Sequence, residues 1–356
     1  MKRIAIKIGS NVLTRANGTL NITRISSLVD QVAELHNQGI QVILISSGAV
    51  ASGRSVHKIN RKLDSVDQRQ LFSAIGQAKL ISLYDELFSH HGITIGQVLT
   101  TKESFSTRRH YLNQRNCMQV MLENNVIPIV NENDTISITE LMFTDNDELS
   151  GIIASMLDAE MLIILSNVDG IFNGPPSDPN SSVIREIRAD EDISDFIVQT
   201  KSTFGRGGML TKTSIARKVA DEGIDVVIAN GIRENILNSI LSHDETVPCT
   251  RFIKTEDGVS SVKKWIAHSG GFAKGAIHIN KNAREALFQK AATSLLPIGI
   301  TKTEGNFDKD DIVKIIDENG QYIGVGRTQY DQETLSNFMG QKGHKPIIHY
   351  NYLFLE

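Results

Sequence analysis

Short apolar runs alternate with longer amphipathic patterns over the first two thirds of the chain, and this alternation restricts the fold more than any other feature. The apolar runs, which are typical of strands, cover residues 4–8, 42–45, 93–99, 126–130, 161–165 and 226–229. The patterns with helical spacing cover residues 24–38, 70–89, 109–124, 146–157 and 211–222. Strands that alternate with helices in this way predict a three-layer α/β/α sandwich around a mainly parallel central sheet.

The pattern changes near residue 250, where the predicted elements become shorter. Residues 255–261 look like a linker, and from Gly275 onward short strands accompany one helix near residues 284–290. Asn319-Gly320 between apolar runs is a strong signal for a β-hairpin. We therefore expect a first domain at residues 1–255, a linker at 256–274 and a small β-rich domain at 275–356.

The composition is that of a soluble globular protein with room for two domains: 356 residues, 40% hydrophobic and 22% charged. The formal net charge of -4 gives no overall basic character to attract nucleic acid or an anionic membrane. Cys117 and Cys249 fit neither a disulfide framework nor a zinc spacing, which indicates a reducing cytosol. Because no apolar run is long enough to span a bilayer and the first residues lack the core of a signal peptide, we expect a cytoplasmic protein.

Two runs of acids and amides follow the apolar run at residues 126–130. The first is Asn131-Glu132-Asn133-Asp134, and the second is Thr144-Asp145-Asn146-Asp147-Glu148. One such run alone would fit a solvated loop. A strand that ends in polar residues also delivers them to the carboxyl edge of the sheet, where open α/β sheets bind ligands. Acids at that edge can hold an ammonium group or Mg²⁺, and amides can bind a carboxylate.

Segments rich in small residues stand beside two lysines. The first strand ends in Lys7-Ile8-Gly9-Ser10, and Arg206-Gly207-Gly208-Met209-Leu210-Thr211-Lys212 leads into the helix at 211–222. A glycine-rich loop that enters a helix N-terminus is a suitable anion site. It is not a Walker A loop, because Thr211 precedes the lysine, and it is not a dinucleotide fingerprint, because Leu210 stands at the third glycine position. Ser46-Ser47-Gly48-Ala49 follows the second strand and leaves room for a ligand there.

Two lysines from separate loops would suit phosphoryl transfer, which needs positioning and charge neutralisation more than covalent chemistry by the protein. Mg²⁺ would be carried by the nucleotide phosphates and held in part by carboxylates. A carboxylate acceptor is already nucleophilic at neutral pH. The lack of a plausible histidine base therefore does not count against a carboxylate kinase.

These motifs, in this order and rough spacing, resemble the amino-acid kinase family. The resemblance rests on Lys7-Ile8-Gly9-Ser10, Ser46-Ser47-Gly48-Ala49, Asn131-Glu132-Asn133-Asp134, Asp145-Asn146-Asp147 and Gly207-Gly208-Met209-Leu210-Thr211-Lys212. The C-terminal part resembles a PUA domain, a small β-rich barrel, through Gly275-Ala276-Ile277, residues 294–300, Gly305-Asn306-Phe307 and residues 323–326. Together they cover nearly the whole chain, in the arrangement of the bacterial family members that act on glutamate.

The resemblance implies ATP-dependent, Mg²⁺-assisted phosphorylation of the γ-carboxylate of L-glutamate to L-glutamyl 5-phosphate, the first step of proline biosynthesis. It implies that Lys7 and Lys212 neutralise the phosphates during transfer and that Asp147 orients both lysines. The residues implied to bind glutamate are Ser47, Gly48, Asn131, Asp134 and Asn146, with Asp134 as partner of the ammonium group. The residues implied to bind the nucleotide are Gly9, Ser10, Ser166, Asn167, Arg206, Gly207, Gly208, Met209, Leu210, Thr211 and Lys212. No side chain is assigned as a metal ligand.

Two positions depart from the family pattern. Ser166-Asn167 stands in place of a Thr-Asp pair, which removes a carboxylate near the expected nucleotide, and Arg206 replaces a threonine, which adds a cation near the phosphates. We expect these departures to affect nucleotide binding rather than the type of reaction.

Other functions stay open at this point. A kinase of the same fold could act on N-acetylglutamate, aspartate, a nucleoside monophosphate or isopentenyl phosphate, although an acetylated amine would have little use for Asp134. RNA binding through the PUA-like domain is a second alternative, but Lys263-Lys264 is offset by Asp308, Asp310 and Asp311. Related enzymes are often oligomeric and inhibited by proline, so the resemblance also suggests a homo-oligomer with feedback inhibition.

Overall fold

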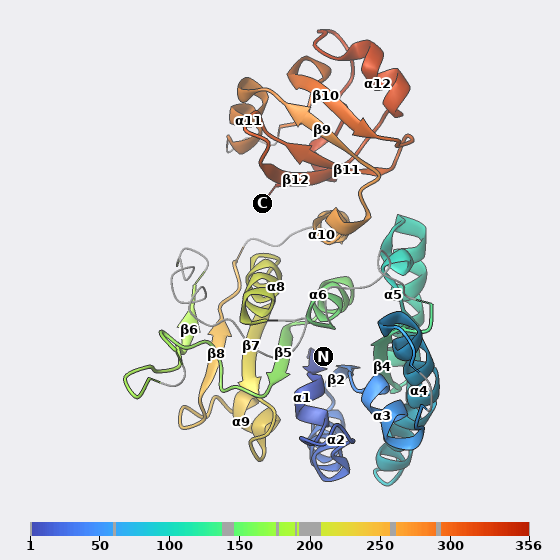
Figure 1. The fold of residues 1–356 in the computed structure, drawn as a ribbon. Coiled ribbons are helices and arrows are strands. Elements are labelled where there is room, and N and C mark those ends of the chain that lie inside the picture. Colours follow the sequence, from blue (N-terminus) through green and yellow to red (C-terminus); the bar gives the residue numbers. More distant parts are fainter. Residues whose placement is uncertain are drawn as a thin grey trace. The chain divides into compact units, whose positions relative to one another are not determined.

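A computed structural model describes residues 2–59, 62–136, 146–175, 178–188, 191, 208–256, 261–289 and 293–355. The chain divides into two compact units (Figure 1). The first consists of Met1–Thr101 and Asn113–Gly258, and the second of Lys102–Leu112 and Val259–Glu356. The predicted domain bounds at 255 and 275 stay a prediction, because the second unit also takes residues from the middle of the chain.

The first unit is built on an eight-stranded sheet in the order β3-β4-β2-β1-β5-β7-β8-β6. Its strands are β1 (Arg3–Ile8), β2 (Gln41–Ile45), β3 (Ile95–Thr100), β4 (Ile127–Glu132), β5 (Met161–Ser166), β6 (Glu186–Ile187), β7 (Asp225–Asn230) and β8 (Cys249–Phe252). All described pairs are parallel except β7 with β8, which confirms the prediction of a mainly parallel sheet. The short β6 and β8 were not predicted, since neither forms a long apolar run.

Helices cover both faces of this sheet (Figure 1). They are α1 (Ser10–Leu13), α2 (Ile22–Asn37), α3 (Ala49–Val56), α4 (Ser65–Ser89), α5 (Arg108–Glu123), α6 (Asn146–Met156), α8 (Met209–Asp221) and α9 (Ile236–Leu241). Ile4, Ile6 and Ile8 of β1 share a core with α2, α4 and α9. The alternate residues face the other way, where α6 packs on β1 and α8 on β7. Lys7 therefore lies on the α6 side of the sheet.

Helix α4 begins five residues earlier than the apolar pattern predicts, because Asp64 caps it. The Asp64 carboxylate accepts the backbone N–H groups of Val66 and Asp67 at 2.9 and 2.8 Å. Helices α3 and α4 then touch through glycines. A Cβ atom on Gly53 would lie 1.9 Å from the carbonyl oxygen of Phe72, and one on Gly76 would lie 1.8 Å from that of Ala49. The small residues after β2 thus serve close helix packing and bring α4 to the ligand edge of the sheet.

The second unit contains a five-stranded sheet in the order β10-β9-β11-β12-β13. Its elements are α10 (Ser261–Ala267), β9 (Gly275–Ile279), α11 (Lys281–Phe288), β10 (Ile300–Gly305), β11 (Ile312–Ile316), β12 (Tyr322–Arg327), α12 (Gln332–Phe338) and β13 (Leu353–Leu355). Strands β11 and β12 form the predicted hairpin, with Gly320 at φ 80° in its turn. This confirms the prediction of a β-rich C-terminal fold.

A segment from between β3 and β4 completes the second unit. Residues Lys102–Leu112 form the short helix η1 (Lys102–Phe105) and the start of α5. The indole Nε1 of Trp265 donates to the carbonyl oxygen of Phe105 at 3.2 Å, and both side chains are buried. The guanidinium of Arg108 lies over the rings of Tyr111 and Trp265, at 5.3 and 5.8 Å from their centroids. The predicted linker region thus contains α10, whose tryptophan anchors the inserted segment.

Two findings bear on the expected class of protein. Cys117 and Cys249 are both free thiols, the first exposed and the second buried. No helix in the described ranges combines the length and the apolar character needed to cross a membrane.

Candidate active site

Three charged side chains meet at the carboxyl end of β1. Lys7 comes from β1, Asp147 from the first turn of α6 and Lys212 from the first turn of α8. The Nζ atom of Lys7 lies 2.5 Å from Oδ1 of Asp147, and Nζ of Lys212 lies 2.8 Å from Oδ2. The Asp147 side chain is fully buried, and the lysine side chains are 6% and 11% exposed. This lysine–aspartate–lysine triad unites the three residues that the sequence assigned to phosphoryl transfer.

The two lysines keep Asp147 ionised in spite of its burial. Burial favours the neutral acid, but the positive charges and hydrogen bonds of Lys7 and Lys212 outweigh that effect and lower the pKa of Asp147 to about 2. With all three groups charged, the triad has one positive charge in excess. Such a cluster can accept an anionic group, such as a phosphate, beside the lysines.

The turn after β1 brings backbone close to the triad. Gly9 donates its N–H to the carbonyl oxygen of Leu165 at 2.9 Å, and a Cβ atom at Gly9 would lie 3.1 Å from that oxygen and 3.7 Å from Nζ of Lys7. Ser10 follows as the first residue of α1. A side chain at position 9 would press on the Leu165 carbonyl oxygen and fill space next to the lysine, so glycine leaves this approach open.

The end of β5 supplies the next residues of the same edge. Ser166 is the buried last residue of β5, and Asn167 is exposed after it. Two residues later, Asp169 accepts bonds from Arg233 at 2.7 and 2.9 Å and from Asn230 at 3.1 Å. The hydrogen bond from Arg233 is the main cause of a lowered pKa for Asp169. A carboxylate therefore remains near Ser166-Asn167, although the sequence lacks an aspartate at position 167.

Helix α8 begins within the predicted phosphate loop. Gly208 is its N-cap residue, and Met209, Leu210 and Thr211 form the first turn, with Leu210 56% exposed. This start directs Lys212 inward to Asp147. Arg206 and Gly207, two further predicted nucleotide-binding residues, lie outside the described residues.

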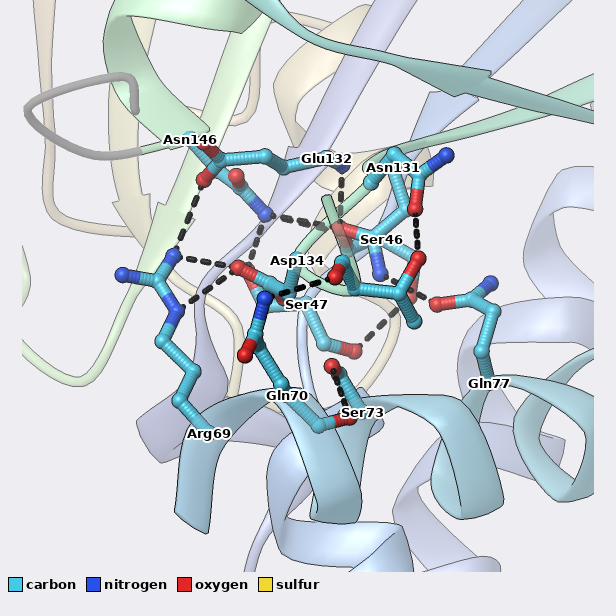
Figure 2. A network of polar contacts seen from close by, with 12 residues as sticks. Ser46, Ser47, Arg69, Gln70, Ser73, Gln77, Asn131, Glu132, Asp134 and Asn146 are labelled. Atoms are coloured by element: carbon cyan, nitrogen blue, oxygen red, sulfur yellow. Dashed lines mark hydrogen bonds and ion pairs between the residues drawn. The ribbon is translucent and has the colours of Figure 1, made fainter. Parts of the chain in front are cut away.

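A network of amides connects β2, β4 and α6 (Figure 2). Nδ2 of Asn146 lies 3.0 Å from the carbonyl oxygen of Ser46, 3.0 Å from Oγ of Ser47 and 3.1 Å from Oδ1 of Asn131. The Asn131 amide in turn donates to Oε1 of Gln77 in α4 at 2.9 Å. Gly48, at φ 100°, is the N-cap of α3 beside Ser47. The structure thus brings together the predicted substrate residues Ser47, Gly48, Asn131 and Asn146.

Asp134, the remaining predicted substrate residue, is bound to an arginine that the sequence did not reveal (Figure 2). Nε of Arg69 donates to Oδ1 of Asp134 at 2.8 Å, and Nη2 contacts the same oxygen. Nη2 also donates to Oε2 of Glu132 at 3.1 Å. Arg69 and Gln77 were missed because they lie on α4, more than fifty residues away in sequence from their partners. No local pattern links such positions.

The described residues contain no group of three or more histidine, cysteine, aspartate or glutamate side chains that could hold a metal ion. Asp147 has both lysines as partners, which makes it a poor ligand for a cation.

Comparison with known proteins agrees with this geometry. Residues 2–230 match the model of the amino acid kinase family, and residues 275–350 match that of the PUA domain. Glutamate 5-kinase of Bacteroides thetaiotaomicron is 66% identical over 99% of this chain and 98% of its own length. Glutamate 5-kinase of Chlorobaculum tepidum is 47% identical over 99% of this chain and 97% of its own length.

Among solved structures, carbamate kinase from Giardia lamblia bound to AMP-PNP matches with a TM-score of 0.52 at 17% identity. The match covers 71% of this chain and 99% of that one, and at this identity it concerns the fold alone. The family model, the full-length relatives and the fold agree. The chain belongs to the amino acid kinase family and carries a C-terminal PUA domain.

Proposed function

We propose that the protein phosphorylates the γ-carboxylate of L-glutamate with ATP, giving L-glutamyl 5-phosphate and ADP, the first step of proline biosynthesis. The buried Lys7–Asp147–Lys212 triad is the observation that supports phosphoryl transfer. The choice of glutamate rests on the full-length relatives named glutamate 5-kinase.

The reaction needs charge control rather than a general base. A γ-carboxylate oxygen of glutamate forms a bond to the γ-phosphorus of ATP while the bond from that phosphorus to the bridging oxygen breaks, and ADP leaves. Lys7 and Lys212 stabilise the charge that develops on the transferred group and on the leaving phosphates. Asp147 keeps the two ammonium groups side by side, which lysines alone would resist by repulsion. Mg²⁺, held chiefly by the nucleotide phosphates, would neutralise further charge.

The remaining site residues divide between the two substrates in this proposal. Gly9 and Ser10 contact the transferring phosphate, and Ser166, Asn167 and the run 206–212 bind the nucleotide. Ser47, Gly48, Asn131 and Asn146 bind the carboxylate groups of glutamate, and Asp134 binds its ammonium group. The amide network of Asn146 and Asn131 supports this division, because its donors and acceptors gather between β2 and β4.

The proposal is tested by incubating purified protein with glutamate, ATP, Mg²⁺ and hydroxylamine, which traps an acyl phosphate as a hydroxamate. ADP release is measured in parallel with aspartate, N-acetylglutamate and UMP as acceptors. We expect hydroxamate and fast ADP release with glutamate only. Faster turnover with aspartate, N-acetylglutamate or UMP would refute the choice of substrate, and a lack of turnover with every acceptor would refute the kinase function.

We further propose a cytoplasmic location, a homo-oligomer and inhibition by proline, which shares the α-carboxylate and a cationic amine with glutamate. Added proline in the hydroxamate assay tests the inhibition, and light scattering after size exclusion tests the oligomer. Inhibition competitive with glutamate is the expected result. Proline that leaves the rate unchanged at millimolar concentration would contradict it.

A further inference from the structure

The guanidinium of Arg69 is shared between two acidic side chains of the candidate acceptor site. It donates to Asp134 from Nε at 2.8 Å and to Glu132 from Nη2 at 3.1 Å. The Glu132 and Asp134 side chains are 4% and 11% exposed, and that of Arg69 is 24% exposed. Ion pairs this close to the interior are far less screened by solvent than surface pairs. The ion pairs of Arg69 with Asp134 and Glu132 therefore help to fix the positions of the two carboxylates.

The charges of these three groups leave one negative charge in excess. The lysine–aspartate–lysine triad of the same unit has one positive charge in excess. Glutamate carries an ammonium group at one end and the reacting carboxylate at the other. The ammonium end suits the negative cluster of Arg69, Glu132 and Asp134, and the carboxylate end suits the positive triad. The two clusters therefore favour one orientation of an amino acid with a free α-amino group.

We propose that Arg69 is a positioning residue that holds Asp134, beside Glu132, ready to receive the α-ammonium group of the acceptor. This deepens the proposed function and rests on it. Without a cation between them, two carboxylates this close would repel, and the repulsion is relieved when one turns away or takes up a proton. Either change removes Asp134 from the place where an ammonium group would meet it.

The geometry allows Asp134 to serve both partners. Arg69 contacts Oδ1 of Asp134, and a carboxylate offers about four acceptor sites in all, so one carboxylate can accept from a guanidinium and from an ammonium group at the same time. Helix α4 is a fixed support for Arg69. The next residue, Gln70, donates to the carbonyl oxygen of Thr135 at 2.9 Å, and the glycine contact at Gly76 seats α4 against α3. A positioned guanidinium on a rigid helix preorganises the acceptor site.

The test compares Arg69→Met and Arg69→Lys with Lys79→Met, which removes an exposed charge from the same helix. For each protein we would measure kcat, KM for glutamate and the competitive inhibition constant of glutarate, which has the same two carboxylates but no amino group. Arg69→Met should raise KM for glutamate about ten- to a hundredfold, the range for a hydrogen bond to a charged group, with kcat within about threefold. The constant for glutarate should stay within about threefold, because glutarate has no ammonium group to lose.

Arg69→Lys should raise KM for glutamate by a smaller factor, about three- to tenfold, and should again leave the inhibition constant of glutarate nearly unchanged. The effect is smaller because lysine keeps the positive charge but lacks the planar guanidinium. Arg69→Lys also provides the test if Arg69→Met fails to fold. An equal rise for glutamate and glutarate would show a merely structural role and overturn the proposal. A KM for glutamate that is unchanged or lower would also overturn it. Wild-type protein that does not use glutamate would instead refute the proposed function itself, and the proposal with it.

Discussion

The substitution Asp147→Asn tests the central triad most directly. Asparagine has nearly the same shape as aspartate, so it fits the fully buried position but removes the charge that Lys7 and Lys212 share. Two ammonium groups would then remain close together, with an amide between them. We expect both stability and turnover to fall.

The loss of stability can be estimated from the pKa of Asp147. Its fall from 3.8 to about 2 corresponds to roughly 2 kcal/mol of stabilisation of the charged form in the folded protein. Removal of one partner from a buried ion pair costs about 3–5 kcal/mol, because it leaves a buried charge uncompensated. We therefore expect Asp147→Asn to lower the free energy of unfolding of the first unit by about 2–5 kcal/mol.

The sign of the pH dependence follows from the same pKa. Because the folded-state pKa lies below the unfolded value, the stabilisation is fully present above pH 3.8 and is lost as pH falls toward about 2. Other acids titrate in that range as well. The difference between wild type and Asp147→Asn should therefore shrink between pH 4 and pH 2 and stay constant at higher pH.

The assay is urea unfolding followed by far-ultraviolet circular dichroism, combined with steady-state kinetics. Asp158→Asn is the matched control, since Asp158 is 49% exposed and pairs with Arg115 at 3.1 Å, a surface pair worth at most about 1 kcal/mol. Turnover should fall about a hundred- to a thousandfold for Asp147→Asn, the usual loss when one electrostatic contribution to the transition state is removed. A variant with wild-type stability and kcat within threefold of wild type would refute the role given to the triad.

Four further substitutions separate the parts of the site and of the second unit. Lys212→Ala should lower kcat strongly, by about a hundredfold or more, because its charge matters most in the transition state; near-normal kcat would contradict this. Asp134→Ala should mainly raise KM for glutamate, measured with ATP saturating, and an unchanged KM would exclude it as the ammonium partner. Arg206→Thr should change KM for ATP more than KM for glutamate, and the reverse order would remove that residue from the nucleotide site. Phe105→Ala should destabilise the second unit by about 3–5 kcal/mol, seen as an earlier unfolding transition in the fluorescence of Trp265, the single tryptophan; an unshifted transition would show that Phe105 contributes little packing.

Much of the fold followed from local pattern. Strands β1, β2, β4, β5 and β7 are largely apolar and almost wholly buried, so their runs stand out in the sequence, and Gly39 and Gly223 mark helix ends at positive φ. The residues of the triad could also be predicted, because Lys7 and Asp147 belong to motifs at predicted strand and helix ends. These features depend on neighbours in sequence.

What the sequence did not reveal depends on residues far apart in the chain. Arg69 lies 65 residues from Asp134 in the sequence. It also lies just outside the helix that the apolar spacing predicts, which begins at residue 70. The role of Arg69 becomes visible only in the fold, where Asp64 caps α4 five residues earlier than predicted and Gly76 allows that helix to pack closely on α3. The insertion of Lys102–Leu112 into the second unit was also missed, because nothing local distinguishes it from a connecting loop.

That insertion has a consequence for synthesis on the ribosome. Phe105 and Trp265 are 160 residues apart in the chain. At translation rates of about 5–20 residues per second, residue 105 is made roughly 8–32 seconds before its tryptophan partner. During that interval Lys102–Leu112 has no unit to join, and Phe105 and Tyr111, which are buried in the finished fold, remain uncovered. The second unit therefore cannot be completed while the chain grows past residue 112, and its assembly must wait until the C-terminal residues 259–356 have been made.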